Sequence, residues 1–192
     1  MQGSDEEQGM ANDMSTQTDT AISIRPCVQG DEQALALVGQ STFLEAFAGI
    51  LDGADVIAHC QRQHDVQLYR DWLAQPAMRL WLAEATPGGA PIGYLVLSPA
   101  SLPVAKPRPN DLEIKRIYLL HRFQGQRVGQ RLMQAAVEHA RVSGAGRVLL
   151  GVYAENHDAL AFYARCGFAQ LGRRTFRVGR TDYQDVILGM TL

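Results

Sequence analysis

The chain has 192 residues, of which 46% are hydrophobic and 20% are charged, and its formal net charge is −2. These values are typical of one globular domain with a substantial core and leave little room for two full domains. The charges are unevenly divided, because residues 1–105 carry four bases and thirteen acids whereas residues 106–192 carry fourteen bases and seven acids. This division fits either an anionic ligand on the basic half and a cationic one near the acidic half, or ordinary solvated surfaces.

The first twenty residues contain five acids, no base and almost no large apolar side chain. Such a segment cannot bury enough surface to offset its ordering entropy, so we predict a disordered leader over residues 1–20 and one domain over residues 21–192. The leader lacks the basic start and apolar core of a secretory signal, and no later run approaches the roughly 18 apolar residues of a membrane span. We therefore expect a cytoplasmic protein without a membrane partner.

The three cysteines, Cys27, Cys60 and Cys166, are odd in number and far apart in the sequence. This pattern fits neither a disulfide framework nor a zinc site, so buried free thiols and no bound metal are expected. Neither a basic motif nor an aromatic-basic platform appears, which argues against a nucleic-acid partner.

The apolar pattern along the chain predicts a mixed α/β domain without internal repeats. The predicted strands cover residues 21–26, 79–83, 92–97, 112–120, 148–153, 168–178 and 183–188. The predicted helices cover about residues 31–47, 54–73, 130–143 and 158–165. Asp31 is the expected cap of the first helix, and Thr86-Pro87-Gly88-Gly89 is turn chemistry that makes the second and third strands an antiparallel hairpin.

The segment Gln124-Gly125-Gln126-Arg127-Val128-Gly129-Gln130 lies between a predicted strand and an amphipathic helix. A helix start has unpaired N–H groups and a partial positive charge, and glycines let the backbone approach an anion, so this place can hold phosphates. Arg127 and Arg131 would add positive charge. The segment matches neither a Walker loop nor a dinucleotide fingerprint, and by itself it is equally consistent with glycines that only shape a tight turn.

In its context the segment resembles the acetyl-CoA loop of the GNAT superfamily of acetyltransferases, Gln/Arg-x-x-Gly-x-Gly/Ala. Gln124 and Gly129 match its two ends, whereas Arg127 replaces the usual middle glycine. That replacement is tolerable in a right-handed conformation and unfavourable where φ is positive. Residues 156–168, Asn-His-Asp-Ala-Leu-Ala-Phe-Tyr-Ala-Arg-Cys-Gly-Phe, are similar to the family's Asn-x-x-Ala-x-x-Phe-Tyr-x-x-x-Gly-Phe segment. Two signatures in the right order are much harder to obtain by chance than one.

The resemblance implies a single mixed, mostly antiparallel twisted sheet of about six to seven strands flanked by about four helices. It also implies that acetyl-CoA is the co-substrate, its pantetheine arm pairing with backbone exposed where two strands separate, often at a bulge. The residues that the resemblance assigns to acetyl-CoA are Ile117, Tyr118, Leu119, Gln124, Gly125, Gln126, Arg127, Val128, Gly129, Gln130, Asn156 and Tyr163.

Acetyl transfer requires a neutral amine, and a primary alkylamine has a pKa near ~10, so a proton acceptor is useful at neutral pH. Glu113, eleven residues before Gln124, has the spacing of a family glutamate that acts as base. The alternative is a carboxylate that orients substrate or pairs with Lys115 or Arg116. Tyr163 resembles the family tyrosine that returns a proton to the leaving thiolate, and its alternative is a core aromatic residue.

By resemblance, the first two helices form one lip of the acceptor site. The acids in that region, which would favour a cationic acceptor, are Glu45, Asp52, Asp55, Asp65 and Asp71. Segments 41–47 and 149–153 look similar to the branch that contains bacterial spermidine/spermine acetyltransferases, so a polyamine is the first hypothesis for the amine. The alternatives are another acceptor amine, namely an amino acid, an antibiotic or a protein N-terminus, and a module that binds acetyl-CoA as a sensor or interaction domain without turnover. Exposed strand edges near the C-terminus also allow a homodimer.

Overall fold

The computed structural model describes residues 21–178 and 181–192, so the predicted leader over residues 1–20 lies outside the described residues. The strands are β1 (Ala21–Pro26), β2 (Arg79–Thr86), β3 (Ala90–Pro99), β4 (Asp111–Leu119), β5 (Arg147–Tyr153), β6 (Ala169–Val178) and β7 (Thr181–Thr191). The helices are α1 (Glu32–Phe47), α2 (Gly53–Gln63), α3 (Val66–Ala74), α4 (Val128–Val142), α5 (His157–Arg165) and the short 3₁₀ turn η1 (His121–Phe123). Within the described residues, no helix is long and apolar enough to cross a membrane.

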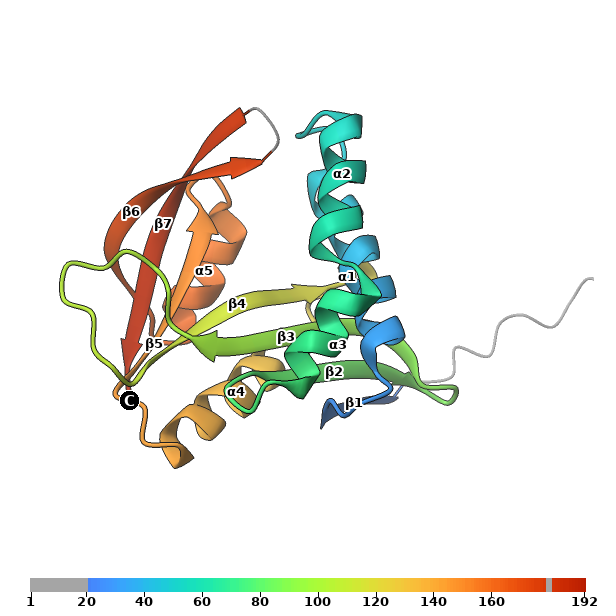
Figure 1. Ribbon diagram of the computed structural model, residues 1–192, viewed down its shortest axis with the longest axis horizontal. Coiled ribbons are helices and arrows are strands. Elements are labelled where there is room, and N and C mark those ends of the chain that lie inside the picture. The colour runs from blue at the N-terminus through green and yellow to red at the C-terminus, as the bar shows by residue number, and fades with distance from the viewer. Residues whose placement is uncertain (1–20, 179–180) are drawn as a thin grey trace, which may run out of the picture.

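The strands form one sheet of seven in the order β1-β2-β3-β4-β5-β7-β6 (Figure 1). Every neighbouring pair is antiparallel except β4 and β5, which run parallel. The predicted mixed, mostly antiparallel sheet is therefore confirmed. The parallel pair sits in the middle of the sheet because α4 carries the chain back along one face between the two strands.

The two faces of the sheet are covered by different helices (Figure 1). On the first face, α4 and α5 bury the largest core cluster, which includes Leu132, Leu150 and Tyr163. On the second face, α1 and α3 pack over β2 and β3 around Leu35, Tyr69 and Tyr94. Farther along the second face, over β5 and β7, the loop of residues 100–110 packs Leu102 against Leu149 and Ile187.

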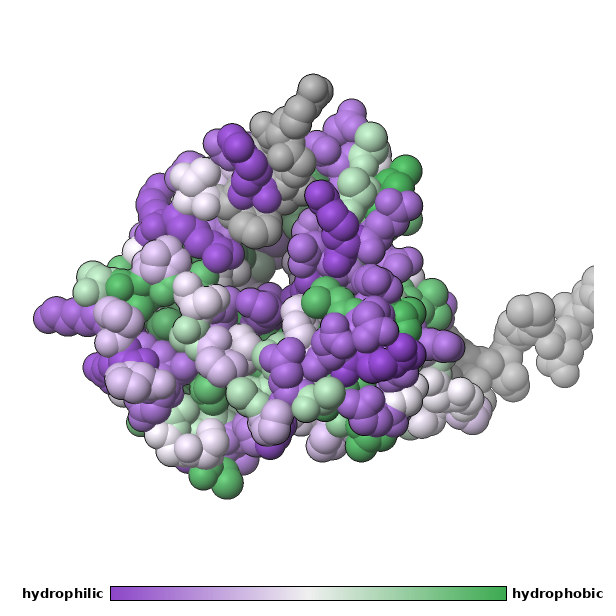
Figure 2. All heavy atoms as spheres, viewed as in Figure 1, coloured by the Kyte–Doolittle hydropathy of each residue, from purple (hydrophilic) through white to green (hydrophobic). Residues whose placement is uncertain are grey.

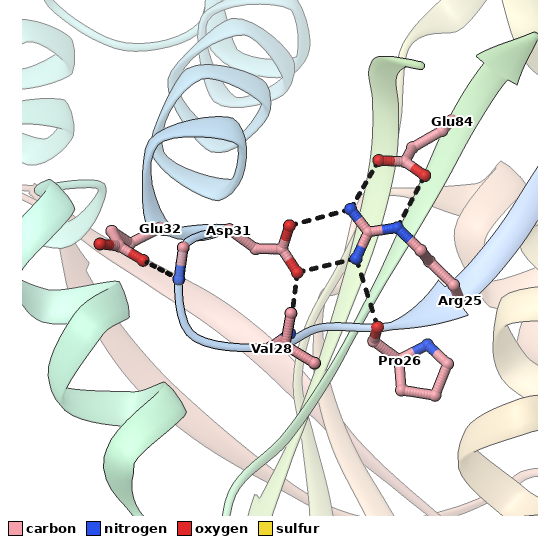
Figure 3. A network of polar contacts seen from close by, with 7 residues as sticks. Arg25, Pro26, Val28, Asp31, Glu32 and Glu84 are labelled. Atoms are coloured by element: carbon pink, nitrogen blue, oxygen red, sulfur yellow. Dashed lines mark hydrogen bonds and ion pairs between the residues drawn. The ribbon is translucent and has the colours of Figure 1, made fainter.

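A forked ion pair fixes the entry into α1 (Figure 3). Arg25 of β1 donates to both oxygens of Asp31, at 2.7 and 2.8 Å, and to both oxygens of Glu84 on β2, at 2.8 and 2.7 Å. Hydrogen bonds from Arg25 are the main cause that lowers the pKa of Asp31. Asp31 was expected to cap α1, but its side chain makes no cap hydrogen bond and binds Arg25 and the Val28 amide instead.

The single helix predicted over residues 54–73 is wrong, because the structure divides it into α2 and α3. Asp65 causes the division, since its carboxylate accepts the Gln67 amide at 3.2 Å and starts a new helix. His64, which directly follows α2, is buried against Phe43 of α1 and Tyr69 of α3. The three cysteines are free, as predicted, but each is only partly buried.

An ion pair joins the first residues of the central parallel strands. Arg147 of β5 donates from Nε to Oδ1 of Asp111 at 3.1 Å and from Nη2 to Oδ2, and the Arg108 amide also donates to Oδ2. Burial alone would raise the pKa of Asp111, but these hydrogen bonds outweigh it and hold the pKa below its usual value of 3.8. Both side chains are nearly inaccessible, so the pair fixes where β4 and β5 begin to run together.

Replacing Asp111 by Asn should lower the free energy of unfolding by about 3 kcal/mol, because Arg147 then stays buried without its counter-charge. The native carboxylate stabilises the fold fully above its unfolded pKa near 3.8 and loses this effect as pH falls through the lower folded value. The difference from wild type should therefore shrink below about pH 4. Urea unfolding at several pH values measures it.

The matched control is Glu138→Gln, which removes an exposed carboxylate 3.9 Å from Arg141. It should change the free energy of unfolding by less than about 0.5 kcal/mol. An Asp111→Asn protein as stable as this control would contradict the role of the ion pair.

Candidate active site

The central feature of the site is a separation between β4 and β5. Parallel pairing joins residues 111–114 only to residues 147–150, and beyond Ile114 the two fully described strands have no further paired residues. At the same level β4 contains a bulge, since Val96 of β3 pairs with Arg116 and Leu97 pairs with Ile114. The extra residue, Lys115, increases the local twist and directs the rest of β4 away from β5. The structure thus has the separated, bulged strands that the family resemblance implied.

Backbone groups of β4 face this gap. Leu120 donates its amide to the Ile92 carbonyl at 2.9 Å, and the register makes Tyr118 the β3-bonded partner of Tyr94. Because hydrogen-bonding directions alternate along a strand, the amides of Ile117 and Leu119 point toward the gap. Of the three predicted pairing residues, Ile117 and Leu119 therefore present backbone to the gap, whereas Tyr118 directs its backbone to β3.

The gap leads to the start of α4. No side chain caps this helix, so its first amides, those of Val128, Gly129 and Gln130, have no intrahelical acceptor. Gly125 just before it has a φ of +78° with open space around it, so the backbone is accessible there. An α-helix start of this kind attracts anions. The start of α4 therefore has unpaired amides and accessible backbone at the place where the sequence analysis expects phosphates to bind.

Arg127 adopts a left-handed conformation, which the sequence analysis identified as unfavourable for any residue other than glycine. Its φ is 60° and its ψ is 11°, and it is the sole described residue other than glycine with a positive φ. Strain of this type costs on the order of 1 kcal/mol. Arg127 directly precedes the first residue of α4, whereas Arg131, also predicted to add charge there, donates to the Ile22 carbonyl of β1 at 3.1 Å.

Helix α5 packs on the first face, next to the start of α4. Asn156 caps it by accepting the Ala159 amide at 3.1 Å through Oδ1, which leaves the side-chain NH₂ free to donate. Phe162 lies against the α4 start, 3.6 Å from where a Cβ on Gly129 would stand. Burial raises the pKa of Tyr163, and the nearby Tyr118 adds to this rise, so the phenol is protonated at neutral pH. A protonated phenol is the form that can donate a proton.

Glu113 lies on the second face, below the gap. It is buried, and Ser101 donates both its backbone amide, at 2.8 Å, and its hydroxyl, at 3.1 Å, to Oε2. The carboxylate therefore holds the 100–110 loop. Among the described residues it has no hydrogen bond or ion pair with Lys115 or Arg116, the partners considered in the sequence.

Arg116 fixes the α2–α3 turn beside the bulge. Its Nη1 donates to the Gln63 carbonyl at 2.6 Å and to the Tyr69 hydroxyl at 3.0 Å, and its guanidinium lies 4.7 Å from the centre of the Trp72 ring. The same hydroxyl is 2.9 Å from Nδ1 of His64. Burial, assisted by the charge of Arg116, lowers the pKa of His64 to about 3, so the imidazole is neutral.

Three residues that the sequence analysis missed lie on the other side of the gap, on the second face. Arg174 of β6 donates to Oδ2 of Asp185 on β7 at 3.1 and 3.0 Å, and its guanidinium rests on Gly151 of β5. Burial raises the pKa of Asp185. A glycine inside an apolar strand marks a close approach by another group, so Gly151 carried a signal that was available in the sequence.

Four of the five acids that the sequence analysis placed at the lip of the acceptor site bind neighbouring groups within the fold. Asp52 and Asp65 cap α2 and α3, Asp71 accepts from Gln67, and Glu45 accepts the His121 amide at 2.7 Å. Those carboxylates are used inside the fold. Figure 2 shows this face hollowed between the α1–α2 pair and the β6–β7 hairpin, with hydrophilic side chains around the hollow.

Known proteins are similar to this chain in sequence and in fold. Residues 45–168 match the sequence profile of the family described as the acetyltransferase (GNAT) family. An uncharacterised N-acetyltransferase of Mycobacterium tuberculosis is 28% identical over 82% of this chain and 96% of its own, and another of Lactobacillus delbrueckii is 25% identical over 90% and 99%. PaiA N-acetyltransferase of Thermoplasma acidophilum, solved with coenzyme A, superposes with a TM-score of 0.70 at 18% identity, covering 90% of this chain and 99% of that one.

The sheet, the separation of β4 from β5 and the similarity to these relatives place the chain in the class of acyl-group transferases. It belongs to the GNAT family and is an N-acetyltransferase.

The strain at Arg127 is tested by two variants that both remove the guanidinium. Arg127→Gly relaxes the left-handed conformation and Arg127→Ala retains it, so the glycine variant should be more stable by about 1 kcal/mol in urea unfolding. The same pair of substitutions at Gln126, whose φ is not positive, should show the opposite order. Equal stability of the two Arg127 variants would contradict the strain.

Proposed function

We propose that the protein transfers an acetyl group from acetyl-CoA directly to the amine of a small molecule, with both bound at once. The observation that supports this most is the β4–β5 gap, which presents the Ile117 and Leu119 amides and continues to the uncapped start of α4. The similar fold of PaiA, which was solved in complex with coenzyme A, supports this ligand. No covalent acetyl-enzyme is required, because holding both reactants together supplies a large proximity effect.

The gap and the loop would hold acetyl-CoA along its length. The amides of Ile117 and Leu119 donate to the pantetheine arm and can stabilise charge on the thioester oxygen. The Asn156 NH₂ group donates to the same arm, and the residues that surround the phosphates are Gln124, Gly125, Gln126, Arg127, Val128, Gly129 and Gln130. When bound, acetyl-CoA supplies an activated acetyl group as a thioester.

Tyr163 is the proposed proton donor to the departing sulfur. Its hydroxyl stays protonated because burial raises its pKa, and the residue belongs to the same core cluster as the side chains of Ile117 and Leu119. Glu113 keeps two proposed roles. It either accepts the proton of the amine or orients the acceptor side by holding Ser101 and the 100–110 loop.

The acceptor is proposed to be a small amine, with a polyamine as one member of the class. The use of Glu45, Asp52, Asp65 and Asp71 within the fold weakens the argument for a polycation, because those carboxylates are not a free anionic surface. The alternative of an acetyl-CoA sensor rests on Arg127, whose side chain stands where the family has a glycine.

The direct test measures thiol release from acetyl-CoA with spermidine, spermine, amino acids, an aminoglycoside and a peptide amine, with calorimetric binding of acetyl-CoA alongside. Turnover on any amine supports the proposed reaction and names the acceptor. Binding without turnover across the panel favours the sensor, and absence of binding contradicts the proposal.

Tyr163→Phe should lower kcat about 100-fold while leaving the acetyl-CoA dissociation constant within about twofold, because only the transferable proton is removed. Steady-state thiol release and calorimetry measure the two quantities. Wild-type turnover in Tyr163→Phe would remove the residue from proton transfer.

Gly129→Val should abolish measurable acetyl-CoA binding, since branched methyl groups would stand over the helix start and press on Phe162. Gly129→Ala is the matched control: its Cβ would meet Phe162 at an ordinary 3.6 Å, so the fold is retained and the loss is smaller. Unchanged acetyl-CoA affinity in a folded Gly129→Val protein would contradict the placement of the phosphates.

A further inference from the structure

Gly151 lies at the point where β5 leaves β4, one residue beyond the last parallel pair. Its neighbours Leu150 and Val152 face α4 and α5, so the Gly151 position faces the acceptor side of the sheet. A Cβ there would stand 2.8 Å from Nη2 of Arg174. The guanidinium of Arg174 therefore reaches from β6 across β7 to the edge of the gap, and the missing side chain of Gly151 leaves room for it.

Asp185 lies beneath this guanidinium and is 6% exposed. Arg174 donates twice to Oδ2, and within the described residues Oδ1 has no hydrogen-bond partner. The carboxylate also acts across the gap: burial raises the pKa of Tyr118 on β4, and the charge of Asp185 adds to that rise. Tyr118 in turn contributes to the raised pKa of Tyr163. Asp185 and Tyr118 therefore lie within electrostatic range of each other, although the gap separates β4 from β5.

We propose that Asp185 is a further catalytic residue, whose free Oδ1 binds the ammonium group of the acceptor and takes its proton. This inference rests on the proposed acetyl transfer. An amine acceptor is a cation before it reacts, and Asp185 offers a carboxylate oxygen on the acceptor face beside the gap. Glu113 differs, because Ser101 fixes its carboxylate beneath the 100–110 loop. Glu113 is thereby assigned the second of its two roles, which is to position that loop.

The proton balance of the step is complete without another reactant. Asp185 takes one proton from R–NH₃⁺ and later releases it to solvent. The amine lone pair forms the new N–C bond while the C–S bond breaks and its electron pair goes to sulfur. Tyr163 gives its proton to the sulfur and regains one from the nitrogen, so the products are an amide, a free thiol and one released proton.

Asp185→Asn tests this directly, because it keeps the size of the side chain and an oxygen for Arg174. With the panel amine that turns over fastest, kcat/KM for the amine at pH 7 should fall about 100-fold, and the acetyl-CoA dissociation constant should stay within about twofold. Binding of the same amine to the coenzyme A complex, measured by calorimetry, should weaken about tenfold or more.

The pH profile separates proton transfer from a structural effect. In wild type, kcat/KM should rise with pH as Asp185 loses its proton, at a pH above 3.8 because its pKa is raised. In Asp185→Asn that limb disappears, and the rate should instead climb toward the pKa of the amine as free amine accumulates. The charged or titratable groups near Asp185 are its ion-pair partner Arg174, Tyr153, which is paired with it on β5, Tyr183 beside Tyr153, and Tyr118 of β4, whose pKa the charge of Asp185 raises.

The matched control is Asp182→Asn on the same hairpin, whose carboxylate pairs with Arg177 at 2.7 Å and is half exposed. It should leave kcat/KM within about twofold. If Asp185→Asn does not fold, Asp185→Glu keeps the carboxylate and should retain the acid limb at a shifted pH. Two results would overturn the inference but not the acetyltransferase activity: a folded Asp185→Asn protein that turns over as fast as wild type, or one whose kcat/KM still rises with pH in the acid range as in wild type. If the wild-type protein itself shows no turnover, the proposed function is overturned instead.

Discussion

The separation of β4 from β5 is the constraint on which the site depends. Two strands that run parallel at the centre of a sheet normally stay paired, because every backbone group left unpaired in the interior costs free energy. Here the Asp111–Arg147 ion pair holds the strands together at one end, and the bulge at Lys115 turns β4 away after four paired residues. The unpaired amides beyond that point are therefore available to a ligand.

The sheet gives its two faces different chemistry. On the face of α4 and α5, an uncapped helix start, a left-handed Arg127 and a buried, protonated Tyr163 suit an anionic, thioester-bearing ligand. On the opposite face, Asp185 lies among polar and aromatic side chains from several strands. Because the gap passes between the two sets, a donor on one face and an acceptor on the other can meet without a covalent enzyme intermediate.

Local features of the chain were readable from the sequence. The loop at Gly125 and the α5 cap at Asn156 depend on neighbours within a few residues, so pattern and spacing sufficed. The helix expected over residues 54–73 was wrong because the cap formed by Asp65 outweighed a continuous helical pattern. The acids of the acceptor lip looked like a binding surface, yet most of them cap helices or hold a neighbouring segment.

The proposed acceptor side could be recognised only from the folded structure. Gly151, Arg174 and Asp185 come from three strands, and only the register of β5, β7 and β6 brings them together. The backbone conformation of Arg127 likewise could not be predicted, because the amino-acid sequence was compatible with both a right-handed and a left-handed conformation at this position.

Hydrogen exchange of individual backbone amides, followed by NMR with and without coenzyme A, tests the central claim most directly. The amides of Ile117 and Leu119 should exchange many times more slowly when coenzyme A is bound, whereas the Tyr118 amide, which is bonded to β3, should change little. Exchange at Ile117 and Leu119 that is unaffected by saturating coenzyme A would contradict the account.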